Sequence, residues 1–234
     1  LIVHEQNSVF GMTNKSLAKM ADLVMSGFDL DGQLNAVWVG NPVRESIENI
    51  NKHFSRTNPV NVLVLGGSLG AQSLNTLVPK LLSEWIDCGD IKIKHQCGRG
   101  KLRATQAAYG DLAMQADIQE FIQNMAAAYQ WADICICRAG ALTIAEVTAV
   151  GIPTIFVPYP HAVDDHQTHN ALSLVNKQAA LVWQESESEA DFVDAFRTML
   201  DPETRTAMQA AINDIQKPQV AQLIANRCVE VVNA

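Results

Sequence analysis

The sequence lacks the features that mark several large classes of protein. No run approaches the ~20 consecutive apolar residues that span a bilayer, and no signal peptide is visible. Lysine and arginine together number 17 against 25 aspartates and glutamates, which gives a formal net charge of −8. A protein that holds DNA or RNA by its phosphates is normally basic, so we expect no nucleic-acid partner.

Cysteine is scarce and is not arranged as a disulfide framework. The five cysteines are scattered and odd in number, which fits a reducing cytoplasm. Cys135 and Cys137 alternate along the segment DICIC, so both side chains point to one face of a strand. They could be two small buried hydrophobes or metal ligands. Because no second Cys or His pair has zinc-finger spacing, the sequence favours the first interpretation.

Three well-known motifs are also missing. HEQN lacks the second histidine of H-E-x-x-H, and the turn GGSLG is neither a P-loop nor G-x-G-x-x-G. The strand after that turn ends in His95-Gln96, where an NAD-binding fold would carry an acid for the ribose. These absences argue against a zinc protease, a P-loop NTPase and a typical dinucleotide-binding enzyme.

What the sequence does contain is a globular core built from alternating strands and helices. Hydrophobic residues make up 48% of the chain and charged residues 18%. From Val60 onward, short apolar runs alternate with segments of helical periodicity, which predicts a doubly wound parallel sheet. The strands are expected at Val60–Leu65, Ile91–His95, Ile118–Phe121, Ile134–Cys137, Thr154–Val157 and Ala180–Trp183.

The first 59 residues follow a different pattern. Leu1–Val3 and Val37–Val39 are predicted strands, and Lys15–Met25 is a predicted helix. Residues Glu45–Pro59 are polar and weakly patterned, as in a linker. The chain opens without Met and inside a predicted strand whose neighbours are not supplied upstream. We therefore expect a fragment that lacks an N-terminal part.

Two small-residue turns follow predicted strands and precede helices. In Gly66–Gly70, glycines would let backbone N–H groups approach a phosphate at a positive helix N-terminus, or they would simply permit a tight turn. In the run Ala141–Glu146, Thr143 and Glu146 match a capping box. The alternative is a second phosphate cradle in which the Glu146 carboxylate accepts both hydroxyls of a ribose. Two cradles in one sheet favour a nucleotide sugar.

Further polar groups stand at expected strand ends. HEQN follows the first strand, and Arg44 follows Pro42 in a rigid loop, where an arginine is usually solvated. A later loop holds histidines and acids that could bind a divalent ion or cap the next helix: His161, Asp164, Asp165, His166 and His169. The amides of Gln167 and Asn170 in the same loop would suit sugar hydroxyls.

With these residues in view, the chain resembles the MurG family of bacterial glycosyltransferases. The matching segments occur in the family's order and span nearly the whole chain. They are HEQNSVFGMTN, VGNPVR, VLGGSLGAQSLN, FIQNMAAAYQWAD, CRAGALTIAEVTAVGIPTIFVPYP and DDHQTHNA. His166 departs from the pattern, since some members carry Gln there.

The resemblance implies a GT-B fold, two Rossmann-like α/β domains facing across a cleft. Residues 1–43 would be the tail of an N-terminal, acceptor-side domain that is largely missing from this chain. Residues 44–216 would be the C-terminal domain that binds UDP-N-acetylglucosamine (UDP-GlcNAc). Residues 217–234 would form a helix that crosses back to the first domain.

The resemblance also implies donor contacts and a reaction. The contacts would fall on Asn7, Arg44, Ser68, Ile122, Ala141, Leu142, Thr143, Ile144, Ala145, Glu146 and Gln167. Ile122 would meet the uracil, Glu146 the ribose, Ser68 and the Ala141–Thr143 turn the pyrophosphate, and Gln167 the sugar. No metal or other cofactor is expected. The catalytic base would belong to the missing part, and Glu5 is the one candidate in this chain.

The expected reaction is transfer of N-acetylglucosamine, with inversion, from UDP-GlcNAc to the C4 hydroxyl of lipid I in peptidoglycan synthesis. The enzyme would be peripheral, at the cytoplasmic face of the bacterial inner membrane, held there by the missing domain. Two alternatives remain at this point. One is a UDP-GlcNAc 2-epimerase, which would also place a glutamate at the ribose, and the other is a non-catalytic module that binds the sugar nucleotide.

Overall fold

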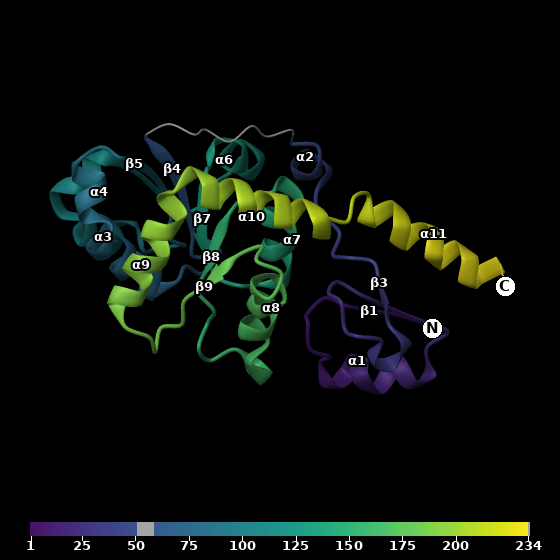
Figure 1. Ribbon diagram of the computed structural model, residues 1–234. Helices are drawn as coiled ribbons and strands as arrows, with labels where there is room; N and C mark the ends of the chain where they lie inside the picture. The colour runs from purple at the N-terminus through teal and green to yellow at the C-terminus, as the bar shows by residue number, and fades with distance from the viewer. Residues whose placement is uncertain (51–58, 234) are drawn as a thin grey trace.

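A parallel six-stranded sheet forms the larger part of the computed structural model, which describes residues 1–50 and 59–233 (Figure 1). Its strand order is β6-β5-β4-β7-β8-β9. The strands are β4 (Val60–Leu65), β5 (Ile91–Gln96), β6 (Ala116–Gln119), β7 (Ile134–Cys137), β8 (Thr154–Phe156) and β9 (Leu181–Val182). Every neighbouring pair is parallel, so the predicted doubly wound sheet is confirmed.

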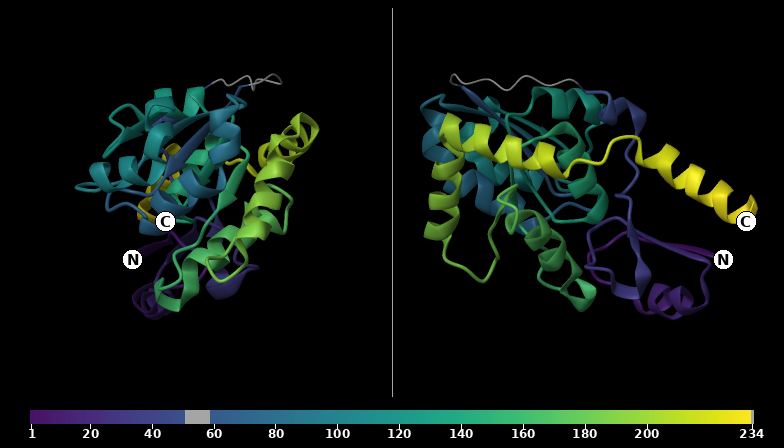
Figure 2. Two further views of the ribbon diagram at one scale, coloured as in Figure 1. Left: turned by 90° about the vertical axis from the view of Figure 1, so that its left-hand side faces the viewer. Right: turned by 45° about the vertical axis from the view of Figure 1, so that its right-hand side comes forward.

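Helices cover both sides of the large sheet, so its central strands are largely buried on both faces. All four residues of β7 are buried, Cys135 and Cys137 included, and five of the six in β4 are buried. Helix α3 packs on α5, and α7 packs on α6, α8 and α10; Figure 2 shows helices on either side of the large sheet. The helices of this part are α3 (Gln72–Leu81), α4 (Ser83–Asp87), α5 (Leu102–Tyr109), α6 (Met125–Trp131), α7 (Ala141–Val150), α8 (His166–Val175), α9 (Glu189–Leu200) and α10 (Pro202–Ile215).

A second, three-stranded parallel sheet precedes the large one and corrects one prediction. Its strands β1 (Ile2–Glu5), β2 (Leu23–Ser26) and β3 (Val37–Trp38) pair in that order. The predicted helix Lys15–Met25 is wrong in its second half. Helix α1 (Met12–Leu17) and a 3-10 turn (Ala18–Met20) end before Leu23, where β2 begins between β1 and β3. Pairing on both sides outweighs the helical spacing of the apolar residues.

Three smaller differences concern element ends. A short helix, α2 (Glu45–Glu48), lies within the predicted linker, and residues 51–58 of that linker lie outside the described part of the chain. Strand β6 begins two residues before the predicted one because Ala116 already pairs with Ile93. No helix within residues 1–50 and 59–233 combines the length and hydropathy needed to cross a bilayer.

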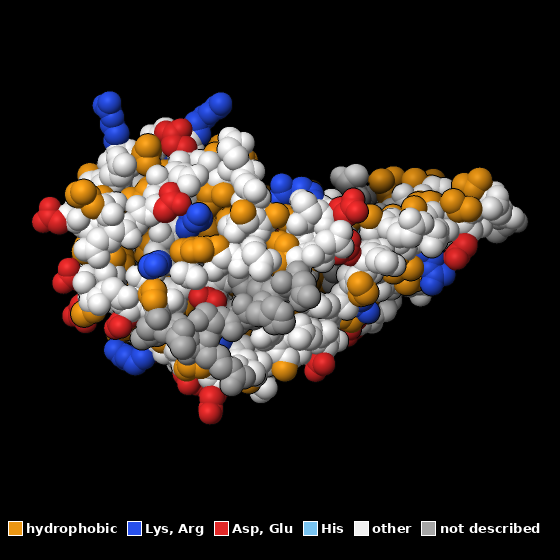
Figure 3. Space-filling model, turned by 90° about the horizontal axis from the view of Figure 1, so that it is seen from above, with side chains coloured by type: hydrophobic (Ala, Val, Ile, Leu, Met, Phe, Trp, Pro, Cys, Tyr) orange, Lys and Arg blue, Asp and Glu red, His pale blue; other side chains and the backbone are white. Residues whose placement is uncertain are grey.

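The last helix, α11 (Val220–Asn233), extends away from the large sheet toward the end that holds the three-stranded sheet, where both termini lie (Figures 1 and 2). Two valines of this helix, Val229 and Val232, are 58% and 82% exposed. Figure 3 shows hydrophobic side chains along this projecting end of the molecule. The helix thus presents apolar side chains that no described residue covers.

A buried histidine closes the side of β5 that faces α3 and α5. His95 is fully buried, with Nε2 3.0 Å from Asn75 Oδ1 and Nδ1 3.0 Å from the Tyr109 hydroxyl. Asn75 Nδ2 donates to the Cys97 carbonyl, so Asn75 Oδ1 accepts from His95 Nε2–H and the Tyr109 hydroxyl donates to Nδ1. This arrangement needs a neutral ring, and burial lowers the pKa of His95 from 6.5 to about 3.

Acid should therefore destabilise the fold through His95. Below pH 6.5 the His95 ring of the unfolded chain binds a proton, whereas in the folded chain the same ring stays neutral down to about pH 3. The unfolding free energy should fall by up to about 1.4 kcal/mol per pH unit across this window from His95 alone. Urea unfolding from pH 7 to pH 4 measures the slope, with His95→Gln as the control that lacks this contribution. Equal slopes in the two proteins would contradict it.

Candidate functional site

A cavity lies where the order of strands in the large sheet reverses. From β4 the chain proceeds outward through β5 and β6, then returns to β7 beside β4 and proceeds the other way. Ligands of open α/β sheets bind at such a switch point, outside the carboxyl ends of the strands. A cavity of about 490 Å³ opens there, within the size range of small-molecule sites.

Six of the residues proposed to contact a donor line this cavity. They are Arg44, Ser68, Ile122, Thr143, Glu146 and Gln167. They come from five segments between residues 44 and 167, and the parallel pairing of β4 with β7 brings the two glycine turns among them to one edge. Asn7, Ala141, Leu142, Ile144 and Ala145 are not among the residues that line it.

The first turn, Gly66–Gly70, is shaped by a close backbone contact. Gly70 has φ +71°, and a Cβ on it would lie 2.0 Å from the Cys97 carbonyl oxygen. Gly98, after β5, also packs against this backbone, because a Cβ on it would lie 2.3 Å from the Gly70 nitrogen. Glycine is therefore needed at Gly70 for geometry, whatever the turn binds. Ser68, at the exposed tip, is free of that constraint.

The two helices that follow the glycine turns, α3 and α7, have N-termini without a side-chain cap. Neither Ala71 before α3 nor Gly140 before α7 accepts a hydrogen bond from the first turn through a side chain. The predicted capping box is wrong, because α7 begins at Ala141 and places Thr143 inside the helix. The first N–H groups of a helix have no intrahelical partner and carry partial positive charge. Two such ends at one cavity form a setting for an extended anion such as a diphosphate.

Glu146, one turn inside α7, has both carboxylate oxygens engaged. Arg44 Nη2 lies 2.9 Å from Glu146 Oε1, and the Tyr129 hydroxyl donates to Glu146 Oε2 at 2.9 Å. Burial, and then the Glu146 carboxylate, raise the pKa of Tyr129 well above 10, so the hydroxyl stays protonated and donates. The carboxylate is thus held in one orientation by a cation from the segment before α2 and by a phenol from α6.

Ile122 is positioned by a glutamine at the end of the neighbouring strand. Gln96 is the last residue of β5, and its Oε1 accepts a hydrogen bond from the Ile122 backbone N–H at 3.0 Å. Both residues are buried and line the cavity. This contact holds the segment after β6 against the end of β5 and gives the cavity an apolar wall.

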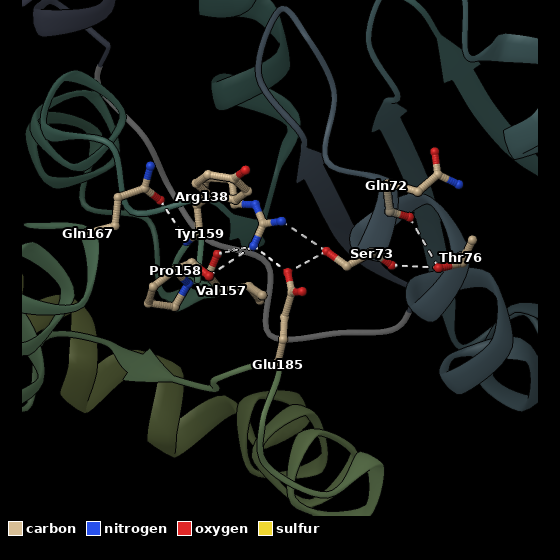
Figure 4. A network of polar contacts seen from close by, with 9 residues as sticks. All are labelled: Gln72, Ser73, Thr76, Arg138, Val157, Pro158, Tyr159, Gln167 and Glu185. Atoms are coloured by element: carbon tan, nitrogen blue, oxygen red, sulfur yellow. Dashed lines mark hydrogen bonds and ion pairs between the residues drawn. The ribbon is translucent and has the colours of Figure 1, made fainter. Parts of the chain in front are cut away.

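Arg138, immediately after β7, lines the cavity and stands at the centre of a network of polar contacts (Figure 4). Its guanidinium donates to the Val157 and Pro158 carbonyls and pairs with Glu185. The next residue, Tyr159, donates its backbone N–H to Gln167 Oε1 at 3.0 Å. Gln167 lies on the first turn of α8 and lines the cavity, and this hydrogen bond fixes its side-chain oxygen.

The loop before α8 shows no metal-binding cluster. His166 Nδ1 lies 2.7 Å from the Val163 carbonyl, and Asp165 Oδ1 accepts from the Thr168 hydroxyl. Within residues 1–50 and 59–233, no group of three or more His, Cys, Asp or Glu side chains is arranged to hold a metal ion. Asp165 precedes α8 but makes no cap hydrogen bond from its side chain to the helix backbone.

The polar residues after β1 mostly hold the two sheets and their loops together. Asn170 is fully buried, and its amide donates to Asn7 Oδ1 and to the Ala139 carbonyl while accepting from Ser8 N–H. The buried Glu5 carboxylate accepts from Asn7 N–H, Gly11 N–H and Asn14 Nδ2. Asn170 therefore joins the two sheets, and Glu5 braces its own loop.

The side chains of the run Ala141–Glu146 point in different directions because the run forms the start of helix α7. Thr143 and Glu146 face the large cavity, whereas Ile144 and Ala145 line a second cavity of about 260 Å³ on the other side of α7. Ala141 is buried, and Leu142 is exposed. At about 100° per residue, one helix cannot present six consecutive side chains to a single ligand. Contacts by the remaining residues of the run would have to use backbone groups.

Sequence reasoning missed the side chains that support those at the cavity. Tyr129 lies within a short apolar helix and carries no signal of its contact with Glu146. Gln96 and Arg138 could have been found, because Gln96 ends β5 and Arg138 follows β7, both at the carboxyl ends of strands near the switch point. Ser73 and Glu185, which meet at Arg138, are 112 residues apart and show no pattern that relates them.

The chain is similar to known proteins over nearly its whole length. Residues 61–226 match the model of the glycosyltransferase family 28 C-terminal domain. A relative from Chromohalobacter salexigens is 44% identical over 98% of this chain, and one from Dechloromonas aromatica is 41% identical over 99%. Both are named UDP-N-acetylglucosamine–N-acetylmuramyl-(pentapeptide) pyrophosphoryl-undecaprenol N-acetylglucosamine transferase.

The structural comparison agrees. The crystal structure of Acinetobacter baumannii MurG superposes with a TM-score of 0.81 at 36% identity, over 96% of this chain. The fold is therefore that of GT-B glycosyltransferases, and the predicted fold class is confirmed. The chain spans 65% of the Chromohalobacter relative, 66% of the Dechloromonas relative and 65% of the crystallised MurG chain. By its matched domain and its similarity over nearly its whole length, the chain belongs to glycosyltransferase family 28, as a member of the MurG group that contains the family's C-terminal domain.

Proposed function

We propose that the protein transfers N-acetylglucosamine from UDP-GlcNAc to the C4 hydroxyl of the muramyl sugar of lipid I, which yields lipid II for peptidoglycan. The observation that carries this proposal is the cavity at the switch point, where two uncapped helix N-termini meet a fixed carboxylate. A diphosphate joined to a ribose matches both features. The names of the relatives supply the sugar and the acceptor, and they favour the transferase over the epimerase.

The donor is proposed to lie across the cavity from Ile122 to Gln167. The uracil would rest against Ile122, the ribose hydroxyls would donate to Glu146, and the sugar would meet Gln167. The diphosphate would lie between Ser68 and the start of α7, with Arg44 nearby. Asn7 and the remaining residues of the run Ala141–Glu146 are proposed to contribute from the edge of this site.

The chemistry is a single displacement. The C4 oxygen of the acceptor forms a bond to C1 of the donor sugar as the bond from C1 to the diphosphate oxygen breaks. Negative charge grows on the departing UDP, and helix N-terminal N–H groups with Arg44 stabilise it where it develops. The acceptor proton needs a base, and the Glu5 carboxylate is already committed to three donors of its own loop.

The acceptor side is proposed to belong to a domain of which residues 1–43 are the last part, with residues 44–216 as the donor domain. Helix α11, after residue 217, would return to the acceptor domain, and that domain would cover the exposed valines of α11. That domain would hold the enzyme at the cytoplasmic face of the inner membrane, where it would serve cell-wall synthesis and hence cell shape and division.

The reaction is tested with UDP-GlcNAc labelled in the sugar and a short-chain lipid I analogue, using the chain joined to a complete acceptor-side domain. We expect labelled disaccharide and free UDP in equal amounts. Appearance of UDP-N-acetylmannosamine instead would identify an epimerase. Binding of UDP-GlcNAc without any turnover would identify a non-catalytic module.

Removing the carboxylate of Glu146 should weaken donor binding strongly. Hydrogen bonds to a charged group contribute about 1.5–3 kcal/mol, so Glu146→Ala should raise the dissociation constant of UDP-GlcNAc about tenfold to a hundredfold. Calorimetry on the purified protein measures this. Glu189→Ala, which removes a carboxylate of an exposed ion pair with Lys80, is the matched control. An affinity of Glu146→Ala equal to that of the control would sink the assignment.

Removing only the hydroxyl of Tyr129 should give a smaller effect in the same direction. Tyr129→Phe leaves Glu146 charged but frees one of its oxygens, so the affinity for UDP-GlcNAc should drop about twofold to tenfold. Tyr109→Phe removes a buried hydroxyl on the far side of the sheet and should leave donor affinity unchanged. If both variants bind as the unmodified protein does, Tyr129 has no part in holding Glu146 for the ribose.

A further inference from the structure

Arg138 lines the cavity where a diphosphate is proposed to bind, yet its charge is already used within the protein. Its side chain is only 15% exposed, and Nη1 lies 2.6 Å from Glu185 Oε1. Nη2 donates to Ser73 Oγ at 3.0 Å, and that hydroxyl donates to the same Glu185 oxygen at 2.6 Å. The three side chains form a closed triangle that joins the end of β7, the first turn of α3 and the segment after β9 (Figure 4).

The same guanidinium fixes the backbone that leads to Gln167. Nη1 also donates to the carbonyls of Val157 at 3.1 Å and Pro158 at 2.9 Å. The Arg138 guanidinium carbon lies 5.4 Å from the centre of the Tyr159 ring, close enough for a cation–π contact. The Tyr159 N–H in turn donates to Gln167 Oε1 at 3.0 Å, so the oxygen end of that amide is held by the backbone.

With its oxygen occupied, the Gln167 side chain has its Nε2 amide hydrogens left to offer to a ligand. The orientation of this amide depends on where the Tyr159 N–H stands, and Arg138 sets that place through the two preceding carbonyls. A lysine in place of Arg138 would carry the charge but could not reach acceptors on three segments from one planar fork.

We propose that Arg138, together with Glu185, is a positioning residue that orients the Gln167 amide toward the sugar of the donor, and that Arg138 does not bind the diphosphate. This inference rests on the proposed function, since it assumes that Gln167 meets the donor sugar. It predicts that Arg138 controls discrimination between UDP-GlcNAc and UDP. A merely structural role, or a phosphate contact, would change the affinity for both ligands equally.

The test measures dissociation constants of UDP and of UDP-GlcNAc by calorimetry and compares their ratio among variants. Gln167→Ala should shift the ratio against UDP-GlcNAc about fivefold, as expected for one hydrogen bond. Arg138→Met should shift it by a similar factor while the affinity for UDP stays within about twofold. The double variant should be no worse than the single ones, because both changes remove the same contact.

Two further variants complete the design. Glu185→Gln preserves shape and leaves Arg138 in place, so it supplies the same readout if Arg138→Met does not fold. Arg197→Met removes an arginine from an exposed ion pair with Asp194 on α9 and should leave the ratio unchanged. Arg138→Lys should behave like Arg138→Met, because charge alone does not restore the contacts.

The outcomes separate this inference from the proposed function. If Gln167→Ala leaves the ratio unchanged, Gln167 does not meet the donor sugar, and both the donor placement and the inference fail. If Gln167→Ala shifts the ratio but Arg138→Met and Glu185→Gln do not, the inference fails alone. Equal losses of affinity for UDP and UDP-GlcNAc in Arg138→Met would show that Arg138 serves the diphosphate, which also overturns it.

Discussion

The parallel pairing of β4 with β7 brings together groups that are distant in the sequence, and the site depends on it. Leu65 pairs with Cys137 at the carboxyl ends of these strands, so the turns that follow them begin side by side. Each turn starts a ten-residue helix without a side-chain cap. Two partial positive charges thus converge at one edge of the sheet, and the tightly packed, largely buried strands below keep that edge rigid.

Most strands and helices of the large sheet could be predicted from hydrophobic periodicity and from the Gly and Pro residues that end them. Val60–Leu65 is apolar except for Asn61, and Ile134–Cys137 is apolar throughout, a composition that indicates a strand covered on both faces. The segment Lys15–Met25 could not be assigned correctly, because Leu17, Ala21 and Val24 are spaced as on a helix although Val24 belongs to a strand. What decides it is pairing with β1 and β3, which is tertiary information.

The candidate site was predictable where residues follow directly from strands and not where side chains meet across the fold. Ser68 stands in the turn after β4 and Thr143 in the first turn of the helix after β7, and both positions follow from the strand order. The contact of Glu146 with Tyr129, and that of Asn7 with Asn170, join segments whose relation no local pattern encodes. The prediction for Asn170 also depended on unseen contacts across the fold. Its amide was expected to suit a sugar, but it is fully buried and hydrogen-bonded within the protein.

The ion pair between Arg44 and Glu146 has a consequence for how the cavity responds to its surroundings. It spans 102 residues and joins the segment leaving the three-stranded sheet to the helix at the centre of the cavity. The Arg44 side chain is 59% exposed and that of Glu146 19%, so dissolved salt screens the pair from one side. An anion bound in the cavity would attract the same Arg44 guanidinium that dissolved chloride screens. Ionic strength and a bound anion therefore act on the same ion pair, which joins the segment after the three-stranded sheet to α7.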